Sequence, residues 1–136
     1  MNKELFKKDF GSLKITDLIV GDDMDKPIVL MCGEEKIGIG THHTQDCCES
    51  VYADFSVMKH FVEQLKGKNL ERITIKGVEA MGFLLCLSHG YEETKVFIPC
   101  YNYQNGYYSS DLELVVDVAG VTTRVDISDM VEDHEG

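Results

Sequence analysis

Apolar and polar residues alternate along most of the chain, and this pattern is typical of strands that bury one face. Turns rich in Gly, Asn and Asp separate the alternating segments. The continuous apolar run at 82–87 indicates a strand that is buried on both faces or lies at the centre of a sheet. Gly38 and Gly40 leave two bare positions on one strand face, which suits close packing or a bulge. The pattern predicts strands at 13–20, 28–32, 37–42, 70–78, 82–87, 95–103, 112–118 and 121–127.

Helical spacing is clearest in a single segment. After Ser56, which is a fair N-cap, apolar residues recur at helical intervals until Gly67, and they predict a helix at 56–66. Residues 1–11 could form a second, short helix that ends near Gly11. Acidic residues 128–136 end the chain either as a short helix or as a frayed tail. We therefore expect one α+β domain at 1–136, with a mainly antiparallel sheet of about seven hairpin-linked strands and one good helix.

Composition narrows the class of protein. With 136 residues, 43% of them hydrophobic, the chain can bury a core as one domain. It has no apolar run long enough to span a membrane and no secretory signal, so we expect a cytoplasmic protein that does not bind membranes. Its five cysteines are odd in number and are expected to be free, buried thiols.

The charge is strongly acidic and unevenly placed. A net charge of −11 argues against general nucleic-acid binding, which depends on a basic face. From Asp111 to the end, the sequence contains eight carboxylates and a single base, Arg124. Such a surface keeps a small protein soluble, and it is also the kind of surface that imitates DNA.

Residues 41–52 hold the densest group of reactive side chains. His42, His43, Cys47 and Cys48 are metal-ligand types, but adjacent strand residues point to opposite faces and no Cys-x-x-Cys spacing is present. We therefore predict no metal and no cofactor, although a metal site or a thiol activated by His43 stays open as an alternative. Buried structural cysteines at a turn are the favoured interpretation.

The carboxylates of the same stretch have two interpretations. Asp46 and Glu49 are three residues apart and could act as an acid/base pair. Asp46 more often caps a turn by accepting backbone N–H bonds. Glu49 stands beside apolar residues, in a segment that we expect to be partly buried.

A second unusual stretch, at 101–110, is rich in tyrosine. Its Asn105-Gly106 pair is the strongest short-range signal for a hairpin turn, and we expect 112–118 to be the return strand of 95–103. Tyrosine faces with amide and hydroxyl neighbours suit stacking on a purine or nicotinamide ring. Ordinary cross-strand packing explains the same tyrosines equally well.

Together the two stretches carry a resemblance. The motifs Gln45-Asp46-Cys47-Cys48-Glu49, preceded by His43, and Asn105-Gly106-Tyr107-Tyr108-Ser109 resemble those of a family of small phage and bacterial proteins of unknown function. More distantly, they are similar to the Thoeris anti-defence sponge proteins of phages. That family has a serine and a tryptophan after the cysteines, where this chain has Glu49 and Tyr52. The resemblance implies binding of cyclic ADP-ribose-type signals without cleavage, by a homo-oligomer.

We accordingly predict a non-enzymatic, phage-encoded binder of a nucleotide-derived immune signal, located in the cytoplasm of the host cell. Tyr107 or Tyr108 would stack on a ring of the ligand, and Asn105 and Ser109 would donate or accept hydrogen bonds. The backbone N–H of Gly106 would approach a phosphate.

The remaining predicted ligand contacts are charged or titratable. Arg124 and Lys95 are candidate partners of a pyrophosphate, while His43 and Glu49 face the tyrosine stretch. We expect Asp46, Cys47 and Cys48 to form a structural corner that holds His43 and Glu49 in place. Two other functions remain open: an acidic inhibitor of a host factor that imitates DNA, and a hydrolase that uses a cysteine with His43.

Overall fold

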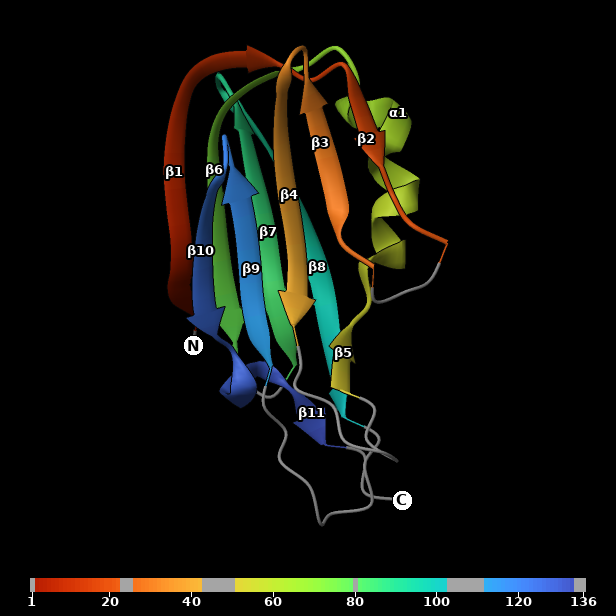
Figure 1. The fold of residues 1–136 in the computed structure, drawn as a ribbon, viewed down its shortest axis with the longest axis vertical. Coiled ribbons are helices and arrows are strands. Elements are labelled where there is room, and N and C mark those ends of the chain that lie inside the picture. The colour runs from red at the N-terminus through yellow and green to blue at the C-terminus, as the bar shows by residue number, and fades with distance from the viewer. Residues whose placement is uncertain (1, 23–25, 43–50, 80, 103–111, 134–136) are drawn as a thin grey trace.

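Two sheets pack face to face in the computed structural model, which describes residues 2–22, 26–42, 51–79, 81–102 and 112–133 (Figure 1). The six-stranded sheet has the order β1-β6-β7-β8-β11, and β5 also pairs with β8. All its neighbours are antiparallel except β11, which runs parallel to β8. Its strands are β1 (Asn2–Lys14), β5 (Val51–Ala53), β6 (Asn69–Val78), β7 (Gly82–His89), β8 (Glu92–Asn102) and β11 (Glu132–Asp133).

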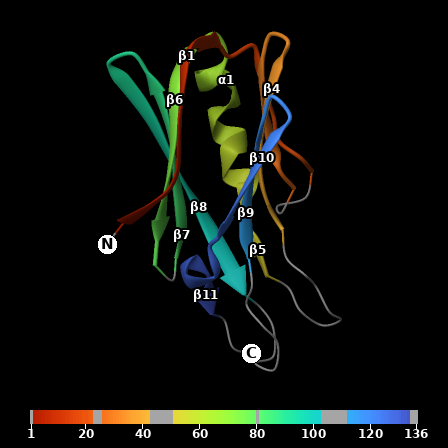
Figure 2. The ribbon, with the colours of Figure 1, turned by 60° about the vertical axis from the view of Figure 1, so that its left-hand side comes forward.

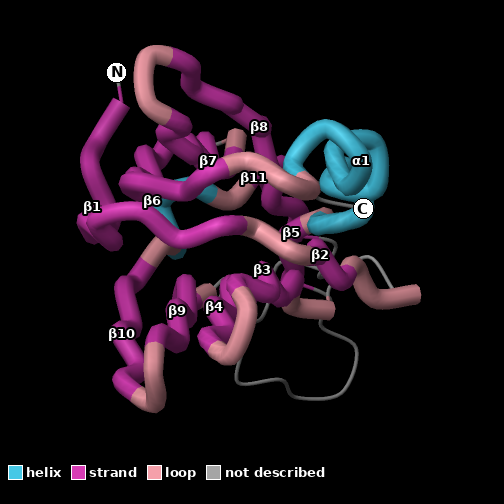
Figure 3. The backbone as a smooth tube through the Cα atoms, turned by 90° about the horizontal axis from the view of Figure 1, so that it is seen from above, coloured by secondary structure: helices cyan, strands magenta, loops and turns pink. Residues whose placement is uncertain are grey.

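The five-stranded sheet has the order β10-β9-β4-β3-β2 and is antiparallel throughout. It lies opposite the six-stranded sheet, as Figures 2 and 3 show from two further directions. The prediction of a mainly antiparallel α+β domain is confirmed. The strands of this sheet are β2 (Asp17–Ile19), β3 (Ile28–Cys32), β4 (Glu35–His42), β9 (Glu113–Val118) and β10 (Val121–Asp126).

The core lies between the sheets, because every second residue of each long strand points inward. β7 lies between β6 and β8, and its run of apolar residues is buried as predicted for a central strand. Phe83 of β7 meets Phe55 across the core with ring centroids 6.0 Å apart. Both side chains are completely buried. Other inward residues with at most 2% exposure include Ile28, Leu30, Ile37, Ile39, Ile73, Ile75, Leu85, Leu87, Val96, Ile98, Leu114 and Val116.

The predicted helix at 56–66 is present but is mostly a 3-10 helix. It comprises η1 (Phe55–Phe61) and a single α-helical turn, α1 (Val62–Leu65). Its N-cap is Asp54 rather than Ser56, because the Asp54 carboxylate accepts the Ser56 backbone N–H at 3.0 Å. Among the described residues, no helix is long and apolar enough to cross a membrane.

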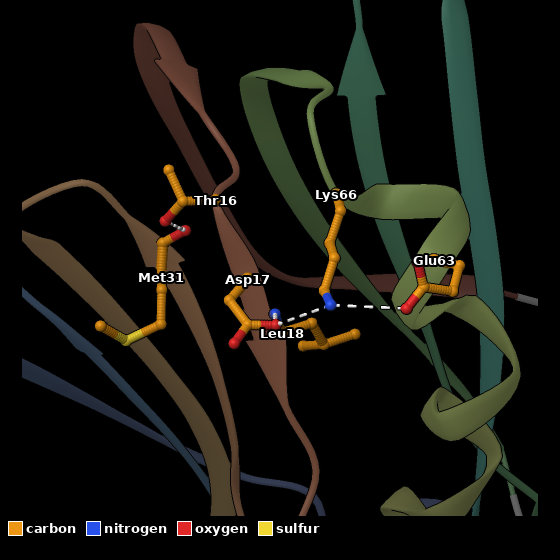
Figure 4. Close-up of polar contacts among 6 residues, drawn as sticks. All are labelled: Thr16, Asp17, Leu18, Met31, Glu63 and Lys66. Carbon is orange, nitrogen blue, oxygen red and sulfur yellow. Dashed lines mark hydrogen bonds and ion pairs between the residues drawn. The ribbon is translucent and has the colours of Figure 1, made fainter.

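The helical segment closes one edge of the sandwich, between β2 and β8 (Figures 1 and 3). Lys66, just after α1, forms ion pairs with Asp17 of β2 at 3.6 Å and with Glu63 of α1 at 3.4 Å (Figure 4). Glu63 first, and Asp17 second, raise the pKa of Lys66. Beside this contact, Thr16 donates to the carbonyl of Met31 and ties β2 to β3.

The predicted helix at 1–11 is wrong, because these residues belong to β1. Register shifts between Glu4 and Phe6 and between Asp9 and Leu13 interrupt its pairing with β6. Each shift moves the next inward side chain by one or more positions. The partly buried residues Leu5, Phe6, Phe10 and Leu13 therefore recur at intervals that imitate a helix.

The strand predicted at 13–20 is also wrong in one respect, since it is two strands in different sheets. β1 ends at Lys14, and β2 begins at Asp17 in the five-stranded sheet. Ile15, between them, is completely buried. Its backbone N–H and C=O pair with Lys68 and Gly67 at 2.8 and 2.7 Å, so the crossing point is fixed.

The predicted hairpin between 95–103 and 112–118 does not exist. β8 lies in the six-stranded sheet and pairs with β7, β5 and β11, whereas β9 lies in the five-stranded sheet between β4 and β10. Residues 103–111 therefore connect two sheets rather than two neighbouring strands, and the Asn105-Gly106 turn itself lies outside the described residues. Of the two endings predicted for 128–136, the short helix is present as the 3-10 helix η2 (Ser128–Met130).

Two glycines of β4 give a matched pair of stability predictions. A Cβ added at Gly40 would lie 2.6 Å from the Cβ of Pro27, whereas one added at Gly38 meets nothing closer than 3.7 Å. Gly40→Ala should lower the free energy of unfolding by about 1–3 kcal/mol, because the backbone must shift. Gly38→Ala should be neutral or slightly stabilising. Urea unfolding of both variants checks this, and equal midpoints would contradict it.

Candidate ligand-binding site

Four strand ends that flank the two unusual sequence stretches lie at the same end of the sandwich (Figure 1). His42, the last residue of β4, pairs with Glu113, the first residue of β9. Val51, the first residue of β5, pairs with Asn102, the last residue of β8. Residues 43–50 lead from the five-stranded to the six-stranded sheet, and residues 103–111 lead back. We call this end of the molecule the crossover end.

On the five-stranded side, the crossover end is fixed by the segment that follows β10. The backbone N–H of Leu112 donates to the Ser128 hydroxyl at 3.2 Å, and its carbonyl accepts the Ile127 N–H at 2.8 Å. Leu112, Ile127 and Met130 are all buried. The chain therefore enters β9 in one fixed position.

Asp126 organises that segment. Its Oδ1 accepts the Ser128 hydroxyl at 2.6 Å and the Ser128 backbone N–H at 3.0 Å. These two bonds, with a smaller contribution from Lys3, hold the pKa of the Asp126 carboxyl below its usual value. The ionised carboxylate thus initiates η2.

On the six-stranded side, the last residues of β8 have strands on both sides. Tyr101 pairs with Tyr52 of β5 on one side and with Glu132 of β11 on the other. The Tyr52 and Tyr101 rings stack in a tilted pair with centroids 5.7 Å apart. Both side chains are partly exposed, so they present aromatic surface beside the two connecting segments.

The described cysteines are buried and far from reactive. Cys32, Cys86 and Cys100 are free thiols, as predicted. Cys100 of β8 is completely buried opposite Ala53, and burial raises its pKa to about 12. Cys100 therefore has a structural role at the crossover end, because a neutral thiol is a poor nucleophile.

Arg124 brings a positive charge to the crossover end. It is exposed on β10, two residues from the end of the strand, and its Nη1 lies 3.5 Å from Glu113 Oε1. Glu113 is also the strand partner of His42 and Asp126. A ligand anion at this point would thus meet a guanidinium that already has a carboxylate partner. No local sequence signal marks Glu113, because a pairing across two strands depends on the register.

Lys95 is not brought to this end. It lies near the opposite end of β8, exposed and 3.5 Å from Glu93. Six residues separate it from Tyr101, which corresponds to roughly 20 Å along a strand. Lys95 and Arg124 therefore do not converge on one pyrophosphate position at the crossover end.

The other predicted site residues lie outside the described residues. They are Asn105, Gly106, Tyr107, Tyr108, Ser109, His43 and Glu49, together with the corner residues Asp46, Cys47 and Cys48. His42 is described and is exposed at the end of β4. In the described part of the chain, no three His, Cys, Asp or Glu side chains are grouped closely enough to hold a metal ion.

A hollow lies away from the crossover end, around the first residues of β6 and the β7–β8 turn. It consists of adjoining cavities of about 420 and 260 Å³ that share Glu71 and Gly90. Its charged groups are already paired: Arg72 with Asp9, and Lys68 with Glu92 at 3.1 Å. Glu71 accepts the Gly90 backbone N–H at 2.6 Å. The hollow thus has little polar capacity left for a ligand.

Comparisons of the chain with protein-family models, with curated proteins and with solved structures give no match. The geometry of the crossover end is therefore the basis on which a function is proposed below.

The Asp126 bonds lead to a pH-dependent stability prediction. Because the folded-state pKa is lowered, the stabilisation is fully present above the unfolded pKa near 3.9 and is lost as the pH falls through the lower folded value. Asp126→Ala should therefore cost about 1 kcal/mol at pH 7, and the difference from the unsubstituted protein should shrink below about pH 4. Thermal unfolding from pH 3 to pH 7 measures this, and a pH-independent difference would refute the assignment.

Proposed function

We propose that the protein is a non-enzymatic binder of a small, ring-bearing, nucleotide-derived molecule, and that its site is at the crossover end. The observation that carries the proposal is the convergence of four strand ends, in which His42 pairs with Glu113 and Val51 pairs with Asn102. Two stretches about sixty residues apart in sequence, each singled out by its side-chain chemistry, therefore begin and end side by side.

Aromatic and polar groups at the crossover end support the class of ligand. Tyr52 and Tyr101 form an aromatic pair at this end, and both residues are partly exposed. Planar heterocycles stack on aromatic faces, and each stacked base contributes about 1–3 kcal/mol. The resemblance of the two motifs to anti-defence sponge proteins directs the choice of ligands to cyclic nucleotides and ADP-ribose isomers.

Charge at this end restricts how a phosphate would bind. Arg124 is paired with Glu113, so a phosphate that recruits the guanidinium must compete with that carboxylate. Both side chains are about half exposed, and exposed pairs of this kind are worth at most about 1 kcal/mol. Competition by a ligand phosphate is therefore energetically feasible, because phosphate–guanidinium hydrogen bonds are charge-assisted on both sides.

Titration calorimetry against a panel of cyclic nucleotides and ADP-ribose isomers tests the proposal. With protein at tens of micromolar, we expect saturable heat with at least one ligand. The ligand recovered after heat denaturation should be chemically unchanged, because no cleavage is proposed. Absence of heat with every ligand would overturn the binding proposal, and recovery of a product would favour the hydrolase alternative.

Three single variants locate the phosphate in that assay. Arg124→Ala should weaken binding about tenfold, because it removes the guanidinium. Glu113→Gln should strengthen binding several-fold, because it frees Arg124 and removes a like charge from the phosphate. Lys95→Ala is the matched control, an exposed cation at the far end of β8, and should leave affinity unchanged. Equal effects of the Arg124 and Lys95 substitutions would place the site elsewhere.

Six of the described carboxylates do not suit the alternative of a DNA-mimicking inhibitor. Six described carboxylates, on β1, β2, α1, β8 and β9, are in ion pairs with lysine or arginine. Imitation of DNA requires acids in a row along one face, with their charges uncompensated. Paired acids on many elements do not supply that row.

A further inference from the structure

β10 is an edge strand with an unusually accessible side. It pairs with β9 along all six of its residues, without a register shift, and forms the border of the five-stranded sheet. Val121, Thr122, Thr123 and Arg124 are exposed, and Val121 has 67% of its surface accessible. The strand contains no proline or lysine, which commonly protect an edge from pairing, and its charged residues are Arg124 and Asp126.

The other sheet borders in the described part of the chain carry such protection. β1 has two register shifts and carries Lys3, Lys7, Lys8 and Lys14. β2 is three residues long, and Lys66 binds its Asp17 from the neighbouring helical segment (Figure 4). β5 and β11 are three and two residues long, and β8, whose second side has no described strand partner before Cys100, carries Lys95 there and contacts η1. β10 therefore differs from the other borders in length, regularity and composition.

Turn geometry determines which backbone groups of β10 point outward. The β9–β10 turn has two residues, Ala119 and Gly120, with φ values of 50° and 82°, which define a type I′ turn. Val118 and Val121 close that turn as a hydrogen-bonded pair, so Thr123 and Val125 also direct their backbone groups toward β9.

The alternate residues, Thr122, Arg124 and Asp126, direct their backbone N–H and C=O groups away from β9. No described residue pairs with these backbone groups. Three donors and three acceptors in one straight row are the pattern that another strand completes.

We propose that β10 pairs antiparallel with β10 of a second copy of this chain, which joins the two five-stranded sheets into one continuous sheet. The two-fold axis passes at Thr123. In this register, Thr122 of each copy forms a hydrogen-bonded pair with Arg124 of the other, which makes four backbone hydrogen bonds.

Side chains are complementary in this register. On the inner face, the exposed Val121 lies opposite Val125 of the second copy, and apolar cross-strand pairs of this kind are stabilising. On the outer face, Arg124 lies opposite Thr122 of the second copy, whose hydroxyl donates to the carboxylate of Asp117. Asp117 forms no ion pair with any described residue. Arg124 and Asp117 are then two strands apart, roughly 10 Å between Cα atoms, a span that their extended side chains bridge.

The neighbouring register is excluded by charge. Two copies related by a two-fold axis must shift by two residues at a time, because a one-residue shift would exchange the two faces of the sheet. An axis at Arg124 sets two guanidinium groups directly opposite one another, which is destabilising. An axis at Thr122 or at Val125 would pair only three residues of each β10, because the strand runs from Val121 to Asp126.

Sedimentation equilibrium of the ligand-free protein tests the proposal. We expect a concentration-dependent mass that approaches twice the 15.3 kDa of the single chain. Thr122→Pro removes an outward N–H without touching a bond to β9, and should raise the dimer dissociation constant at least tenfold. Thr122→Val is the matched control, because it also loses the hydroxyl bond to Asp117 but keeps the N–H, and it should still dimerise.

Charge reversal tests the register separately. Arg124→Glu and Asp117→Lys should each weaken the dimer, because each places like charges in one row, and the double variant should restore it. Thermal unfolding confirms that every variant is folded. A monomer at hundreds of micromolar, or a dimer that Thr122→Pro leaves unchanged, would overturn the proposal. Because no ligand is added, this result is independent of the calorimetric test of binding.

Discussion

Burial of one face of each sheet is the constraint on which the rest of the structure depends. β7 and β8 in one sheet, and β3, β4 and β9 in the other, all direct their inward residues into the same layer. Burying such side chains contributes roughly 1.5–3 kcal/mol each, before the cost of chain entropy. The two sheets must therefore face one another, and a chain that contributes to both must cross between them several times.

The places where the chain passes from one sheet to the other determine where reactive and polar side chains can be grouped. At one end, Ile15 fixes the passage from β1 to β2 by two backbone bonds and complete burial. At the other end, β4 is followed in the chain by β5 of the opposite sheet and β8 is followed by β9, and the Leu112–Ser128 contact fixes the start of β9. Connections between sheets can carry polar and aromatic groups that an inward strand position excludes. The residues that look chemically unusual in the sequence lie, in chain order, between strands of different sheets.

Sequence patterns were sufficient for most strands and insufficient for their partners. The alternation at 28–32, 70–78 and 112–118 reports burial of one face, which is a local property, and these strands are present. At 1–11 the alternation is interrupted, because two register shifts put Leu5 and Leu13 out of phase with the two-residue period of Phe6 and Phe10. The Asn105-Gly106 pair favours a hairpin between β8 and β9. In the fold β9 lies between β4 and β10, and no local signal can specify the pairing with β4.

Prediction of the candidate site had the same limit. The sequence singled out Arg124 and Lys95 because basic residues are scarce, but their separation depends on strand direction and length. Glu113 could not be recognised as the partner of Arg124 without the β9–β10 register. The sequence shows which side chains are present. The distances between them, which decide whether they form a site, are set by long-range strand pairing.

The burial of Cys100 gives this end of the protein an internal reporter. With a pKa of about 12, roughly one thiol in 100,000 is ionised at neutral pH, and the side chain has no access to solvent. Alkylation of Cys100 must therefore proceed through molecules in which the core around it has opened. The rate of modification, compared with that of an unfolded peptide, would measure the free energy of that local opening in the native protein.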